Sequence, residues 1–288
     1  MDNKIIYSFA IYLMVSFGYV NAQQLQGNAI APLPRKDMGK VVAVDSGSLR
    51  ITYALNAEDI TNPDTYIDLQ CLEIGTSFSK YYSRFVYNND SLVLDWRKKH
   101  PDADFPRWLG LTNRRRHSWS EYKYSEYYKD YGTNTITEYT RMPFGVKTNR
   151  QCSEAIPTQS WTIRNEKLTI NGYVCQKATC RFRGRNYTAW FTQDISISNG
   201  PWKFGGLPGL ILKVYDNKRL YTFECVKIEQ TKFQIKKYEY KDHVPMDRLE
   251  LLKLQRMLNE DYYKAIGAKM RDGKPLPNPV SYEPLELE

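Results

Sequence analysis

The stretch that decides the fold is GPWKFGGLPGLI, residues 200–211. It holds four of the sixteen glycines and two of the fourteen prolines of the chain. In the tetrapeptide LPGL at 207–210, proline presets φ at the second turn position and glycine permits a positive φ at the third, which predicts a type II turn. Gly205 and Gly206 permit close approach of the backbone. We therefore expect a rigid loop fixed against a sheet.

Two interpretations of this loop follow from its residues. The residues that the turn itself explains are Gly200, Pro201, Gly205, Gly206, Leu207, Pro208, Gly209, Leu210 and Ile211. The side chains that the turn does not need are Trp202, Lys203 and Phe204, so they are candidates for contact with a ligand. The alternative is a purely structural corner that leads into the strand at 210–216. A phosphate-binding loop is excluded, because no Lys-Ser/Thr pair follows the glycines and a strand comes next.

The segments around the loop have the pattern of antiparallel strands. Asn171-Gly172 is a strong hairpin signal, and it separates strands predicted at 167–170 and 173–183. Alternating residues place Tyr221, Phe223 and Cys225 on one face of a later strand. The full set of predicted strands is 48–57, 65–82, 136–141, 143–150, 161–164, 167–170, 173–183, 187–192, 210–216, 220–229 and 232–244.

A single helix is predicted near the end of the chain. Asp247 is a suitable N-cap, and apolar residues recur at helical spacing from Leu251 to Met270. Gly273 and the prolines after it end the pattern. We therefore expect an α+β fold: a mostly antiparallel, curved sheet or half-barrel with the 246–272 helix packed on it. By analogy alone, this resembles periplasmic lipoprotein carriers.

The strand at 187–192 contributes two more candidate residues. Trp190 and Phe191 point to opposite faces of the sheet, so one belongs to the core and the other is free to line a cleft. Arg185 and Asp194 flank this strand, and they either pair with each other or bind polar groups of a ligand. The alternative for this pair is a loop-pinning salt bridge.

The cysteines and histidines give no clear catalytic or metal signature. The five cysteines are Cys71, Cys152, Cys175, Cys180 and Cys225. In an oxidising compartment they predict one or two disulfides, with buried free thiols as the alternative. Their spacing and three scattered histidines do not predict a metal site or cofactor. A thiol- or carboxylate-dependent hydrolase stays open as an alternative.

The N-terminus predicts export. Residues 1–22 combine Lys4, an apolar run and a small-x-small ending at Val20-Asn21-Ala22, which is typical of a cleaved signal peptide. A membrane anchor is the alternative, but the apolar run is short for a span of about 20 residues. We expect a periplasmic or outer-membrane-associated protein with no transmembrane segment after cleavage. The net charge of +9 favours an anionic partner, but an exported chain is not expected to bind nucleic acid.

The domain organisation is simple. Residues 23–288 are expected to form one β-rich domain, with 97–131 as a possible insertion because that segment is basic, irregular and then rich in tyrosine. Its aromatic and basic side chains could stack on sugars or bind an anionic headgroup, or could simply pack across strands.

With these residues in view, the chain resembles the GLPGLI family of exported bacterial proteins from Bacteroidota envelopes. The resemblance rests on GLPGLI at 206–211, NGYVCQKA at 171–178, Gly184-Arg185, AWFT at 189–192, GPWKF at 200–204 and LELE at 285–288. It covers 161–216 closely and the rest loosely, while 97–131 matches nothing in the family. No catalytic residue or cofactor is established for that family, so the resemblance implies none here.

The sequence therefore favours a non-enzymatic exported binding or carrier protein. Its ligand would be apolar or peptidic and held in the hollow of the sheet. The second hypothesis is an accessory partner of an outer-membrane receptor, docking through the loop at 200–209 or the segment 97–131. The hydrolase is the third.

Overall fold

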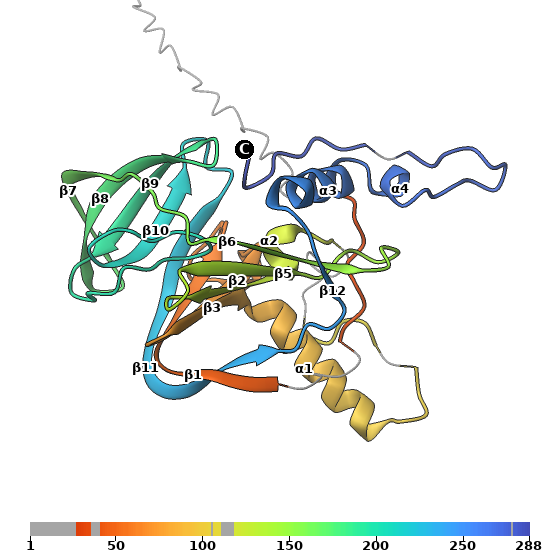
Figure 1. Ribbon diagram of the computed structural model, residues 1–288, viewed down its shortest axis with the longest axis horizontal. Coiled ribbons are helices and arrows are strands. Elements are labelled where there is room, and N and C mark those ends of the chain that lie inside the picture. The colour runs from red at the N-terminus through yellow and green to blue at the C-terminus, as the bar shows by residue number, and fades with distance from the viewer. Residues whose placement is uncertain (1–26, 36–40, 105, 111–117, 278) are drawn as a thin grey trace, which may run out of the picture.

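The computed structural model describes residues 27–35, 41–104, 106–110, 118–277 and 279–288 (Figure 1). The predicted signal peptide at 1–22 lies outside them. The strands are β1 (Val41–Leu55), β2 (Asp68–Gly75), β3 (Phe78–Ser83), β4 (Ser125–Asp130), β5 (Thr135–Thr140), β6 (Asn149–Ala155), β7 (Thr162–Ile170), β8 (Tyr173–Phe182), β9 (Arg185–Thr192), β10 (Leu210–Asp216), β11 (Thr222–Tyr238) and β12 (His243–Pro245). The helices are η1 (Pro63–Thr65), α1 (Arg84–Lys99), α2 (Glu121–Tyr124), α3 (Arg248–Glu260) and α4 (Tyr262–Ala265).

All twelve strands belong to one open sheet in the order β12-β6-β5-β4-β3-β2-β1-β11-β10-β9-β8-β7. Neighbouring strands are antiparallel except for the short parallel pair of β12 with β6. This confirms the predicted mostly antiparallel sheet. β4, which lies within the segment 97–131, is an interior strand between β3 and β5, so that part of the segment belongs to the sheet.

The long strands β1 and β11 join the two parts of the sheet. β1 pairs with β2 on one side and with β11 on the other. Its predicted inward residues Leu49, Ile51, Tyr53 and Leu55 are all buried, which confirms the alternation read from the sequence. The two strands predicted at 220–229 and 232–244 are one strand in the structure, because β11 stays paired with β1 as far as Tyr238.

The turns separate correct from incorrect strand predictions. Asn171 and Gly172 have φ of 50° and 82°, which are the positive values that the predicted hairpin requires. The predicted strand at 65–82 is instead a hairpin of β2 and β3. The strand predicted at 143–150 is wrong, because β6 begins only at Asn149.

The helices depart most from the sequence-based expectation. Asn89-Asp90 is a pair typical of turns, but both residues lie inside α1. Ser83 caps this helix by accepting a hydrogen bond from the Val86 amide. Asp247 caps α3 as predicted, accepting from the Leu249 amide. The predicted 246–272 helix is too long, because α3 ends at Glu260 and Asp261 then caps the separate α4.

The main apolar cluster lies between the two parts of the sheet. It unites residues of β1, β2 and β4 with residues of β8–β11 and of the loop 200–211. In Figure 1, β7–β10 form one end of the molecule, and α1 and α3 lie on the part built from β2–β6. A smaller cluster around Trp119, Leu258 and Tyr262 packs α3 and α4 in place. Within the described ranges, no helix is both long and apolar enough to cross a membrane.

Candidate functional site

The loop at 200–211 is fixed as predicted, but by a tighter turn. The Gly209 amide donates to the Leu207 carbonyl at 2.8 Å, and the Leu210 amide donates to the Ile195 carbonyl at 3.0 Å. The first bond spans only three residues, as in a γ-turn, so the predicted type II turn is wrong. Gly209 has φ of +155°, and a Cβ there would lie 2.0 Å from the Thr192 carbonyl oxygen. Only glycine fits this position.

The Gly205-Gly206 pair is held by a tryptophan outside the loop. The Trp161 indole N–H donates to the Gly205 carbonyl at 2.7 Å. Gly206 has φ of +79°, but its nearest neighbours would leave a Cβ at ordinary contact distance. Glycine is therefore needed at 206 for its backbone conformation rather than for close approach.

Two of the three candidate ligand residues in the loop belong to the core. Trp202 and Phe204 are 2% and 0% exposed, and their rings pack edge-to-face at 5.2 Å between centroids. Phe204 also packs against Tyr187 of β9. These contacts explain both side chains, and their role in ligand binding stays a prediction.

Lys203 is buried in a cluster of carboxylates. Its ammonium pairs with Glu154 at 2.9 Å, with Glu286, and with Glu138 at 3.9 Å. Burial alone would lower the pKa of Lys203, but the charges of Glu286, Glu138 and Glu154 outweigh it and raise the pKa above its usual value. The lysine is therefore a permanent cation inside the protein.

Arg185 holds the C-terminal segment rather than Asp194. Its guanidinium pairs with Asp216 at 3.3 Å and with Glu283 at 2.9 Å. It also donates to the carbonyls of Pro284 and Leu285. Asp194 is exposed, so the predicted Arg185–Asp194 pair is wrong.

The structure thus brings Arg185, Trp202 and Lys203 together around residues 282–288. Leu285 and Glu286 of that segment are 2% and 6% exposed. Sequence reasoning missed this meeting point, as it missed Glu154 and Glu138. The available signal was the LELE ending at 285–288, whose Glu286 pairs with Lys203 of the loop.

The cysteines are free and buried. All five lie in the described residues, and the predicted disulfide is not formed. Burial raises the pKa of Cys71, Cys152 and Cys175 to about 11 and of Cys180 and Cys225 to about 12. A thiol in this state is a poor nucleophile at neutral pH, which weakens the thiol-hydrolase alternative. In the described part of the chain, no group of His, Cys, Asp and Glu side chains could hold a metal ion.

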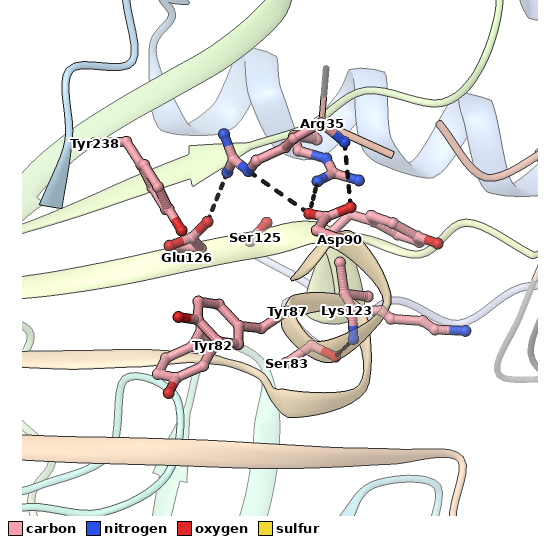
Figure 2. A pocket seen from close by; sticks show the side chains of 12 residues that line it. Arg35, Tyr82, Ser83, Tyr87, Asp90, Lys123, Ser125, Glu126 and Tyr238 are labelled. Carbon is pink, nitrogen blue, oxygen red and sulfur yellow. Dashed lines mark hydrogen bonds and ion pairs between the residues drawn. The ribbon is translucent and has the colours of Figure 1, made fainter. Parts of the chain in front are cut away.

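A second charged cluster surrounds a small cavity beside α1. Figure 2 shows Arg35 between Asp90 of α1 and Glu126 of β4. Arg141 also pairs with Asp90, and Lys80 pairs with Glu126 at 2.9 Å. Burial tends to raise the pKa of Glu126, but Lys80 and Arg35 lower it to about 2.

This cavity is too small for an organic ligand. Its volume of about 20 Å³ holds one water molecule. Its charges pair β3 with β4, and α1 with Arg141 just after β5, which fixes these parts of the chain to one another. No local pattern indicates this cluster, because its members are far apart along the chain.

The outer face of β7–β11 carries an open, polar hollow. Strand pairing places Thr188 of β9 between Thr179 of β8 and Tyr215 of β10. Trp190 is two residues further along the same face and is half-buried, whereas Phe191 is completely buried, which confirms that the two point to opposite faces. A hollow of about 390 Å³ opens here, lined by Ser160, Thr162, Thr179, Cys180, Arg181, Asn186, Tyr187, Thr188 and Asn217.

The chain is similar to one protein family and to two solved structures. A family model described as "N-glycanase peptide, N-terminal domain" matches residues 111–252. Structures of PNGF-II in space groups P21 and C2 match with TM-scores of 0.48 and 0.47 and 16% identity, each covering 75% of this chain. This chain covers 34% of each of those chains, about a third of their length. No curated protein matches.

Proposed function

We propose that this chain is an exported, non-enzymatic binding domain that recognises carbohydrate on the outer face of β7–β11. The observation that carries the proposal is the arrangement around Thr188. The half-buried indole of Trp190 lies on the same face of β9 as Thr188, and hydroxyl and amide side chains line the open hollow at Thr188. Sugars present apolar C–H faces and rings of hydroxyls, so they need both kinds of partner at once.

The chemistry of the hollow supports a neutral glycan. Its volume lies in the usual range for small-ligand sites. The two lysines beside Trp190 in the pairing register, Lys177 and Lys213, are already paired with Glu166 at 2.9 Å and Glu224 at 2.7 Å. Arg181, which lines the hollow, pairs with Glu288 at 3.8 Å. The face therefore offers hydrogen bonds and an aromatic surface, and these three cations are paired.

The similarity to other proteins points the same way. The matched model describes the N-terminal domain of an N-glycanase, and its range includes the whole of β7–β11. We extend the proposal to membership of the GLPGLI family and to a periplasmic or outer-membrane location, on the motifs and the N-terminal 22 residues of the sequence.

The alternatives have weaker support. The carrier-like half-barrel with an apolar or peptidic ligand requires a large enclosed hollow, whereas the enclosed cavities at α1 and beneath residue 285 measure about 20 and 10 Å³. For the outer-membrane partner hypothesis, the loop at 200–209 offers little surface, because Trp202, Lys203 and Phe204 are buried.

Binding of a free oligomannose N-glycan, measured by isothermal titration, tests the proposal. We expect Trp190→Ala to weaken binding at least about tenfold, since loss of one aromatic contact surface is worth about 1.5 kcal/mol or more. Val174→Ala is the matched control, because Val174 is 54% exposed near the start of β8 and away from the hollow. Equal affinity of wild type and Trp190→Ala, or no binding across a panel of neutral glycans, would contradict the proposal.

A further inference from the structure

The contacts of residues 282–288 are those of a bound peptide. We propose that the groove beneath this segment is a recognition site for an extended acidic peptide, and that the chain's own C-terminal segment fills it in cis. The segment has no helix or strand, yet Tyr282, Leu285 and Glu286 are buried. This site meets the hollow on the outer face of β7–β11 at Arg181, which pairs with Glu288 at 3.8 Å, but the inference does not rest on carbohydrate binding.

Side chains of the sheet recognise the backbone of the segment. Tyr221 donates its hydroxyl to the Glu283 carbonyl at 2.8 Å, and Arg185 donates to the two carbonyls that follow. One main-chain bond joins the Leu287 amide to the Arg183 carbonyl at 3.1 Å. Recognition of an extended backbone by fixed donors, with alternate side chains in pockets, is how proteins bind peptides.

Three side chains of the segment give the site its selectivity. Tyr282 donates its hydroxyl to the buried Glu121, and Leu285 joins the main apolar cluster. Glu286 pairs with Lys203, and with Arg248 of α3 at 2.9 Å. The pattern is therefore Tyr-x-x-Leu-Glu, with an acidic residue fixed in the last position.

The body of the protein retains paired charges without the segment. Lys203 keeps Glu154 at 2.9 Å, Arg185 keeps Asp216 at 3.3 Å, and Arg248 keeps Glu154 at 3.8 Å. Loss of the segment therefore leaves no buried cation without a carboxylate, which would otherwise oppose release. This distinguishes the segment from an ordinary part of the core.

The charge of the emptied groove favours an acidic ligand. Around Glu286 the body supplies three cations, Lys203, Arg183 and Arg248, and two carboxylates, Glu154 and Glu138. The excess positive charge is what Glu286 neutralises. A peptide with a carboxylate at this position replaces it, and a neutral or basic peptide does not.

Exchange of the segment in the folded protein tests the inference. A protease site is inserted between Asp272 and Gly273, in an exposed turn, and the purified full chain is cut after folding. A fluorescent peptide with the sequence of residues 273–288 is added in excess, and its anisotropy is followed. We expect stoichiometric uptake, chase by unlabelled peptide, and a cooperative unfolding transition after the segment has been removed.

Changes in the peptide alone define the pattern without any risk to the fold of the protein. Leu285→Ala should bind roughly 30-fold more weakly because a buried leucine is truncated. Glu286→Gln should bind roughly tenfold more weakly because a charged hydrogen bond is lost. Leu287→Ala, at a side chain that is 44% exposed, is the matched control and should bind within about twofold of the parent peptide.

Three results would overturn the inference. They are no exchange over days, collapse of the fold when the segment dissociates, or equal losses for Leu285→Ala and Leu287→Ala. None of these bears on binding of the glycan, which is measured with uncut protein and reports on Trp190.

Discussion

Two buried lysines, Lys203 of the loop at 200–211 and Lys129 of β4, meet different surroundings. Lys203 lies among three carboxylates, whereas Lys129 of β4 donates only to uncharged oxygens, the Asn199 side chain at 2.8 Å and the Phe204 carbonyl at 2.7 Å. Burial lowers the pKa of Lys129 to about 7, while the carboxylates raise that of Lys203. The two are similarly buried, at 5% and 3% exposed, so the partners decide the charge.

The two lysines therefore have different structural roles. Lys203 holds the segment 282–288 through its ion pair with Glu286. Lys129 belongs to a network of hydrogen bonds with uncharged partners, in which the Asn199 amide also donates to the Tyr131 hydroxyl at 2.8 Å. Among the described residues, Lys129 forms no ion pair.

The largest effect is expected for Lys203→Met. It removes the most buried of the three cations that Glu154 and Glu286 share and leaves Arg183 and Arg248, which should lower the free energy of unfolding by about 1.5–3 kcal/mol. Urea denaturation at pH 7 measures this. Lys213→Met, which breaks the partly exposed pair with Glu224, is the control and should cost at most about 1 kcal/mol. Similar losses for both variants would mean that burial adds nothing to the Lys203 cluster.

The second effect appears as a pH dependence of Lys129→Met. The unfolded chain keeps this lysine protonated to near pH 10.5, whereas the folded protein releases the proton near pH 7. Between these values the unfolded state binds more protons, so the stability of wild type relative to Lys129→Met should rise with pH. The slope should be at most about 1.4 kcal/mol per pH unit.

Urea titrations of both proteins at pH 7, 8 and 9 measure that slope. Lys203→Met provides the contrast, because Lys203 is protonated in both states over this range and its difference from wild type should stay flat. A flat difference for Lys129→Met as well would show that Lys129 is charged in the folded protein.

The smallest effect is expected for Tyr131→Phe. It removes the hydroxyl that accepts from Asn199 and should cost about 0.5–1.5 kcal/mol. Thermal unfolding at pH 8, where Lys129 is neutral, measures it. Tyr215→Phe is the control, because the Tyr215 hydroxyl has no hydrogen bond among the described residues, and it should leave the stability unchanged. An equal loss at Tyr215 would remove the case for a neutral network.

Local patterns predicted the strands well, and long-range contacts explain the failures. Alternation located the inward face of β1, and Asn171-Gly172 located a hairpin, because both signals are short-range. α1 was missed because its buried face, Val86, Asn89, Asp90 and Val93, has helical spacing but is half polar. Asp90 is buried only because Arg35 and Arg141 reach it from distant segments.

The ligand-binding role that the sequence suggested for the candidate residues stays a prediction, and the geometry that joins them was not predicted. Arg185, Trp202 and Lys203 were singled out by sequence, and they do converge. Their common partner lies more than 80 residues further along the chain, in 282–288, and no local pattern indicates it. Trp190 was placed correctly on a face because period-2 alternation suffices for that.

The pairing of β1 with β11 can form only late in folding. The partners are far apart in the chain: Leu49 pairs with Gln230, and Val41 with Tyr238. Contacts of such large sequence separation slow folding, because the intervening loop must close first. During synthesis β1 cannot pair with β11 until β11 has emerged, so this edge of β1 is open to pairing with other strands for most of the time the chain is being made.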